Sequence, residues 1–218
     1  MGVDRRRRRD DVQLLSRQIV VFISTRPTRD SEAAFAAYVD SQRDAWGFVP
    51  DYTGCFAARP DVATAWIALA SAVRTTMERR RFELVTIASA RARGSAYCTA
   101  AHAKLLIDAC RDEPTLRELA TDPGGGQLTP VDAAVYRFAA KVATAPASVE
   151  QGDVDDLRAL DLVDSEIAEV VYAVGVRLFF ATVLDALGAR VDPEIAAAFE
   201  EDLLAFVRVL PQVAETGS

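Results

Sequence analysis

The chain has 218 residues, of which 50% are hydrophobic, with 11 glycines and 9 prolines. This composition excludes an intrinsically disordered chain and allows a sizeable buried core. The net charge of -7 gives no general case for binding nucleic acid or an anionic membrane. The three cysteines, Cys55, Cys98 and Cys110, are too few for a disulfide framework and fit a reducing compartment.

The N-terminal segment carries no secretory signal that we can identify. The basic run Arg5 to Arg9 is followed at once by acidic residues, and the apolar stretch Ile19 to Ile23 is too short for a signal peptide. We interpret residues 1–24 as a partly flexible extension, with a nucleic-acid-binding tail as the alternative. The stretch Ile19 to Ile23 fits either a short strand or the end of a helix. The predicted location is cytoplasmic, with a soluble protein and no membrane contact.

Helix start and stop signals dominate residues 25–218 and predict a single all-α domain. Caps, helix-breaking glycines and prolines, and apolar spacing delimit each element, whereas no alternating strand pattern competes. A flexible loop is predicted over 121–129, where three glycines follow Pro123. The predicted helices cover 31–46, a short helix around Cys55 and Phe56 that ends before Pro60, 61–73, 78–93, 95–110, 129–145, 153–160, 165–187, and a last one from 192 to before Pro211.

The helix predicted over 165–187 is apolar almost all round its circumference. Its most apolar part, Val170 to Leu184, is interrupted by Arg177 and is short for a membrane span. A helix of this kind must be buried on more than one side, and a small subunit does this most easily against other subunits. The pattern therefore predicts a homo-oligomer.

The segment from Ser95 to His102 holds the features most typical of chemistry. His102 is the only histidine in the chain, and it lies four residues after Cys98, so the two side chains share a helix face. With Ser95 as the N-cap, Cys98 is the third helical residue and its sulfur lies in the positive field of the helix N-terminus. An imidazole and a helix N-terminus both favour the thiolate form of a cysteine.

Glu83 is the candidate for orienting this histidine. It is the lone acid between Arg79 and Ala103, and a break at Gly94 allows the two helices to fold back as an antiparallel pair. Glu83 can then approach His102, which gives carboxylate, imidazole and thiol in series. The predicted catalytic residues are therefore Cys98, His102 and Glu83.

Each of these residues also has a structural interpretation. Cys98 fits an inert buried cysteine, and His102 fits a packed helix residue bonded to a carboxylate. Glu83 fits a surface ion pair with a neighbouring arginine. Ser95 is explained better as an N-cap than as a catalytic group.

The sequence resembles the alkylhydroperoxidase D / carboxymuconolactone decarboxylase family, whose motif is a glutamate, a Cys-x-x-Cys pair and a histidine four residues after the second cysteine. Glu83, Cys98 and His102 match three of these positions at the family spacing. The surrounding Phe82-Glu83-Leu84-Val85, Gly47-Phe48-Val49-Pro50 and Asp185-Ala186-Leu187-Gly188 agree with it. The resemblance implies an all-helical subunit that assembles into trimers or hexamers, and in the peroxidase branch a cysteine pair that reduces peroxide.

The chain departs from this pattern in two places. Ser95 stands where the family has its first cysteine, so the disulfide that resolves the oxidised sulfur cannot form there. Cys110 is about 18 Å from Cys98 along one helix, which leaves Cys55 as the other intramolecular partner. The stretch Phe179-Phe180-Ala181-Thr182 also lacks the Asn-Arg usual before the Asp-Ala-Leu-Gly segment.

Three functional hypotheses follow. The first is a thiol-dependent peroxidase that uses Cys98, activated by His102 and Glu83, and an external thiol reductant. The second is a cofactor-free lyase acting on a small carboxylated lactone, with the run Arg79 to Arg81 as the candidate cation for the substrate carboxylate and a solvated helix face as its alternative. The third is a non-catalytic helical assembly protein. No zinc spacing, phosphate loop, flavin or nicotinamide fingerprint is present in the sequence, so no metal or cofactor is predicted.

Overall fold

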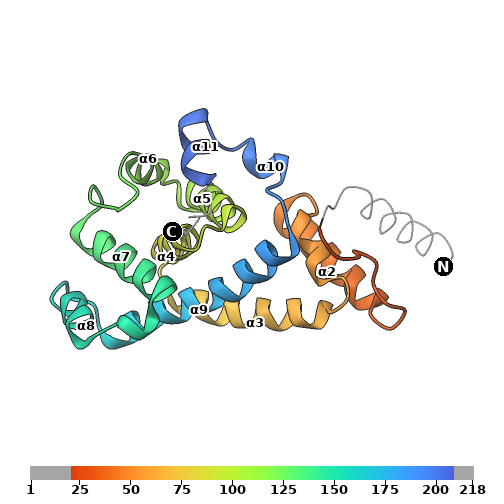
Figure 1. Cartoon of the computed structure of the whole chain (residues 1–218), viewed down its shortest axis with the longest axis horizontal. Helices are drawn as coiled ribbons and strands as arrows, with labels where there is room; N and C mark the ends of the chain where they lie inside the picture. The colour runs from red at the N-terminus through yellow and green to blue at the C-terminus, as the bar shows by residue number, and fades with distance from the viewer. Residues whose placement is uncertain (1–20, 209–218) are drawn as a thin grey trace, which may run out of the picture. The chain divides into compact units, whose positions relative to one another are not determined.

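The computed structural model describes residues 21–208, and every regular element within them is a helix (Figure 1). The predicted all-α fold class is confirmed. The N-terminal run Arg5 to Arg9, residues 19 and 20, and the chain beyond 208 lie outside the described residues. The described chain forms two compact units, one of residues 21–69 and 182–192 and one of residues 70–181 and 193–208. The assignment of 25–218 to one domain stays a prediction.

The first unit contains α2 (Glu32–Trp46) and the 3-10 helix η1 (Asp51–Phe56). Asp51 holds its parts together, because its amide donates to Asp192 Oδ1 at 2.8 Å and its Oδ2 accepts from the Arg190 amide at 2.7 Å. Residues 21–23 form neither the strand nor the helix considered for them. Instead the Phe22 amide donates to the Leu187 carbonyl at 2.8 Å, at the end of α9.

The helix α3 (Pro60–Thr76) leads from the first unit into the second, and α9 (Asp164–Leu187) returns. By length and composition α9 is the one helix of the described chain that fits a membrane span. Half of its apolar window is buried inside the protein, and core helices of soluble proteins pass the same test of length and composition. Tyr172 and Phe179 remain exposed on α9 in the single chain. The homo-oligomer and the cytoplasmic location stay predictions.

The core of the second unit is α4 (Arg79–Ala92), which packs against α5 (Ala96–Cys110) and α7 (Pro130–Thr144) (Figure 1). Every residue from Phe82 to Ala90 is buried. The two buried hydroxyls are satisfied within the helix, because Thr86 donates to the Phe82 carbonyl and Ser89 to the Val85 carbonyl, both at 2.9 Å. A helix buried on all sides can therefore carry a functional side chain into the core.

The turn between α4 and α5 fixes the relation of these two helices. Gly94 has φ +73°, and its amide donates to the Arg91 carbonyl at 2.9 Å. The Ser95 amide donates to the Ala90 carbonyl, also at 2.9 Å, which completes a Schellman motif. The predicted break at Gly94 therefore ends α4 and starts α5 within three residues.

Replacing Gly94 with alanine is expected to lower the free energy of unfolding by about 1 kcal/mol, because a Cβ is disfavoured in the left-handed region. Urea unfolding measures the change. The matched control is Gly152→Ala in α8 (Gln151–Arg158), where an added Cβ meets nothing within 4 Å and alanine should stabilise the helix. Equal effects of the two substitutions would contradict the assignment of a strained turn.

Several elements differ from the sequence prediction. The helix α6 (Glu113–Thr121) was not predicted, although Asp112 caps it and accepts from the Thr115 amide at 3.3 Å. The single helix predicted from residue 192 is wrong within the described range: α10 (Pro193–Ala196) and α11 (Glu201–Val207) are separated by a turn that buries Phe199. The helix α8 begins two residues before the predicted start, at a capping box formed by Glu150 and Asp153.

Candidate active site

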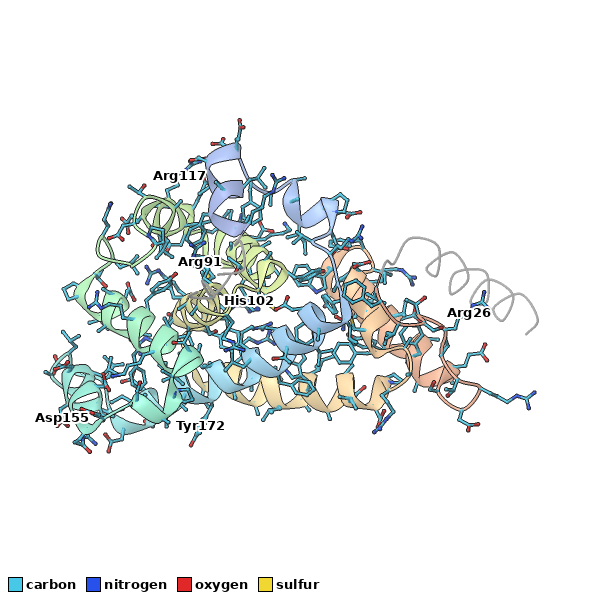
Figure 2. All side chains as sticks on the ribbon, in the orientation of Figure 1. Arg26, Arg91, His102, Arg117, Asp155 and Tyr172 are labelled. Atoms are coloured by element: carbon cyan, nitrogen blue, oxygen red, sulfur yellow. The ribbon has the colours of Figure 1, made fainter. Side chains whose placement is uncertain are left out.

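Glu83 and His102 meet between α4 and α5, as the sequence predicted. The Oε2 atom of Glu83 lies 2.6 Å from Nδ1 of His102, and the Glu83 side chain has no exposed surface. The two residues are 19 positions apart and are brought together by the turn at Gly94. His102, which is labelled in Figure 2, belongs to α5 and is buried. The interpretation of Glu83 as a surface ion pair is wrong about its location, although the ion pair with a neighbouring arginine is present.

The second carboxylate oxygen of Glu83 binds a cation. Oε1 lies 2.6 Å from Nε of Arg79, one helical turn earlier on α4. Burial acts to raise the pKa of Glu83, but His102 and the guanidinium groups of Arg79 and Arg177 outweigh it, so the pKa lies below its ordinary value. Glu83 is therefore a carboxylate at neutral pH, with both oxygen atoms engaged.

His102 is neutral at physiological pH. Burial lowers its pKa from 6.5 to about 4; the charge of Arg177 acts in the same direction, and Glu83 opposes it. Because Glu83 is ionised, Nδ1 of His102 donates the proton of this bond, which leaves Nε2 as an unprotonated base. The ring also packs edge-on against Phe82, with 6.2 Å between ring centroids, which fixes its orientation. A neutral imidazole held by a carboxylate is the arrangement of a general base.

Cys98 is the third residue of α5, as predicted, and is 1% exposed. It lies one turn before His102 on the same helix, close to the positive N-terminal end. Nη1 of Arg177, from α9, donates a hydrogen bond to its sulfur at 3.7 Å. The thiol therefore has a cation and a helix N-terminus beside it, and both stabilise a thiolate.

Arg177 is the residue of this cluster that the sequence does not assign to the site. In the sequence it only interrupts an apolar helix, whereas in the structure it is buried, with 4% of the residue exposed. Its guanidinium carbon lies 5.6 Å from the centroid of the Phe180 ring. The available signal was the lone charge in an otherwise apolar stretch, since arginine is almost never buried unless it is paired.

The run Arg79 to Arg81 does not act as a unit. Only Arg79 contacts the site, through Glu83. Arg80 binds Asp112 and Asp132, and Arg81 binds Glu166 of α9 at 2.8 Å. Each arginine of the run is half-buried and paired with a carboxylate, within α4 for Arg79 and on other segments for Arg80 and Arg81.

Three further residues bear on how an oxidised Cys98 could be reduced, namely Ser95, Cys110 and Cys55. Ser95 is buried at the N-cap position of α5, but its side chain makes no capping hydrogen bond. Cys110 ends the same helix as Cys98, and burial raises its pKa. Cys55 is a free cysteine of the first unit, where burial and then the charge of Asp51 raise its pKa to about 12. Neither thiol therefore has the lowered pKa of a reactive cysteine.

Within residues 21–208 no group of three or more metal-binding side chains is clustered.

Residues 60–141 match the carboxymuconolactone decarboxylase family. The chain is similar to the alkylhydroperoxidase AhpD core of an uncharacterized peroxidase-related protein from Ralstonia eutropha JMP134, with a TM-score of 0.68 and 22% identity over 75% of this chain and 87% of that chain. An uncharacterized peroxidase-related protein from Silicibacter sp. TM1040 aligns with a TM-score of 0.71 and 17% identity, over 80% of this chain and 93% of that one.

A third structure has a different activity. The debrominase Bmp8, as a cysteine-to-alanine variant in complex with 2,3,4-tribromopyrrole, aligns with a TM-score of 0.64 and 16% identity, over 83% of this chain and 97% of that chain. No curated protein gave a significant match. At these identities the structures show a shared fold, and the debrominase shows that this fold hosts more than one activity.

Proposed function

We propose that this chain, whose residues 60–141 match the carboxymuconolactone decarboxylase family and whose fold is that of peroxidase-related proteins, is a thiol-dependent oxidoreductase that reduces a hydroperoxide through Cys98. The observation that carries this proposal is the 2.6 Å bond between Glu83 and His102, one turn from the only cysteine that lies beside a buried cation in the described chain. The bond leaves Nε2 of His102 free of a proton, on the helix that carries the thiol.

The first step transfers one oxygen atom to the sulfur. His102 takes the thiol proton as the sulfur attacks the terminal peroxide oxygen, and the O–O bond breaks with its electron pair leaving on the alkoxide. His102 then delivers the proton to that alkoxide. The products are the sulfenic acid of Cys98 and an alcohol, so the sulfur is oxidised by two electrons and the peroxide is reduced by two. Glu83 keeps His102 oriented throughout.

Resolution requires an external thiol. The serine at position 95 cannot form a disulfide with Cys98, and Cys110 is about 18 Å away along α5. A first thiol condenses with the sulfenic acid to give a mixed disulfide and water. A second thiol releases Cys98 by exchange and forms the oxidised disulfide of the reductant.

Intact-mass measurement after one equivalent of hydroperoxide tests the proposal. The parent protein is expected to gain one oxygen atom, and Cys98→Ser is expected to gain none. Cys110→Ser is the matched control, because it removes a second thiol of the same helix and should leave the oxidation unchanged. Oxidation that persists in Cys98→Ser, or that is lost in Cys110→Ser, would overturn the assignment.

The lyase hypothesis has one observation in its favour. A substrate carboxylate needs a buried cation, and Arg177 supplies one at the site in place of the run Arg79 to Arg81. In that case His102 and Glu83 do the acid–base work and the thiol is incidental. Lactone turnover that survives Cys98→Ser but is lost in His102→Ala would select this activity over the peroxidase.

The non-catalytic hypothesis rests on Ser95. If the natural protein has lost the chemistry, peroxide consumption should appear only when the cysteine pair is restored by Ser95→Cys. Turnover by the parent protein with an external thiol would exclude it.

A further inference from the structure

We propose that Arg177 is a catalytic residue of this site: it stabilises the Cys98 thiolate and makes the oxidised enzyme prefer a negatively charged thiol as reductant. The proposal deepens the proposed function and rests on it for the second part. It stands on three observations, namely the contact with the sulfur, the burial of the guanidinium group and its place on α9.

The contact joins the cation to the reacting atom. Nη1 of Arg177 donates to Sγ of Cys98 at 3.7 Å, within the range of a sulfur hydrogen bond. A donor that carries a full positive charge stabilises the thiolate more than the thiol, because the sulfur gains a charge of opposite sign on ionisation. Since Cys98 is 1% exposed, water screens this interaction little.

The position of Arg177 indicates a function beyond packing. Burying a guanidinium group on an apolar helix costs free energy, and an apolar side chain of similar volume is often as stable or more stable at such a place. The aliphatic stem and the Phe180 ring account for part of the packing, with 5.6 Å between the guanidinium carbon and the ring centroid. These packing contacts do not require that the side chain directs a charged group at the sulfur of Cys98.

The charge on Cys98 changes during the catalytic cycle. The thiolate carries a negative charge beside Arg177, whereas the sulfenic acid is neutral. The reductant attacks the sulfenic sulfur as a thiolate, so it brings a negative charge beside the same guanidinium group during this step, and hydroxide leaves and takes up a proton to form water. A thiol with a further negative charge therefore approaches more readily than a neutral or a cationic one.

Alkylation of Cys98 by iodoacetamide, followed by mass spectrometry as a function of pH, tests the first part. Arg177→Met keeps the volume and removes the charge, and it is expected to slow alkylation at pH 7 about tenfold and to move the profile about one unit towards higher pH. Arg177→Lys should restore most of the rate. Arg81→Met is the matched control, because it also removes an arginine that joins α9 to another helix, here α4 through Glu166, but it does not contact the sulfur.

An unchanged alkylation profile in Arg177→Met would overturn the proposal, and so would an equal shift in Arg81→Met. Urea unfolding of the same variants shows whether they fold. Peroxide oxidation of Cys98 in the parent is scored separately. An alkylation shift without oxidation refutes the peroxidase function alone, whereas oxidation without a shift refutes the role of Arg177 alone.

The second part is tested on protein oxidised at Cys98. The probes are 2-mercaptoethanesulfonate, 2-mercaptoethanol and cysteamine, with rates of reduction expressed per thiolate. The parent should prefer them in this order, from anionic to cationic, and Arg177→Met should reduce the ratio between the first and the last at least threefold. An unaltered ratio would overturn the selection of an anionic reductant.

Discussion

Replacing Glu83 with glutamine is expected to lower the free energy of unfolding by about 3 kcal/mol and to slow peroxide oxidation of Cys98 about 100-fold. The carboxylate is wholly buried, and its two oxygens bind Arg79 and His102, each at 2.6 Å. Glutamine keeps the shape but removes the charge, so the guanidinium group of Arg79 loses its counter-ion. Nδ1 of His102 is then held by a neutral amide, which weakens the base. Urea unfolding and intact-mass kinetics measure the two effects.

The matched control is Glu166→Gln, which breaks the bond to Arg81 at a partly exposed carboxylate. It should cost less than 1 kcal/mol and leave oxidation unchanged. The double variant Arg79→Met, Glu83→Gln removes both charges. It should be more stable than the sum of the two single changes implies, because neither ion is left unpaired. A cost of Glu83→Gln no larger than that of Glu166→Gln would refute the role of the buried carboxylate.

The protein is expected to lose roughly 3 kcal/mol of stability through His102 when the pH falls from 6.5 to 4. The pKa of His102 is 6.5 in the unfolded chain and about 4 in the folded protein, mainly because burial disfavours the imidazolium. Between these values the unfolded state binds more protons than the folded state, so the free energy of unfolding falls as the pH falls. The lowered pKa of Glu83 adds a further loss below about pH 4.5, where the carboxylate protonates on unfolding.

Urea unfolding of the parent protein and of His102→Gln across this pH range measures the contribution of His102. The variant has no imidazole to protonate, so its stability should fall less steeply between pH 6.5 and 4. Cys98→Ser, which keeps the imidazole, should show the slope of the parent. If His102→Gln and the parent have the same slope, His102 is not buried as a neutral base.

Turns and caps that depend on local residue types could be predicted from the sequence, whereas features that depend on tertiary packing could not. The turn at Gly94 and the cap at Thr129 were predicted correctly because the residue types themselves require these conformations. The separate helices α10 and α11 were predicted as one, because only the tertiary burial of Phe199 explains the turn between them. Similarly, Ser95 lies at the predicted cap position, but its side chain makes no capping bond.

The sequence by itself determined the all-helical fold, because helix start and stop signals act over short distances in the chain. The break at Gly94 permitted the pairing of Glu83 with His102, and the tertiary structure established it. Only the tertiary structure decided that Arg177, 79 residues from Cys98, touches the sulfur, and that Arg80 and Arg81 are bound to carboxylates of other segments. These contacts join distant segments, and the partner of a charged side chain depends on which helices pack together, which no local pattern specifies.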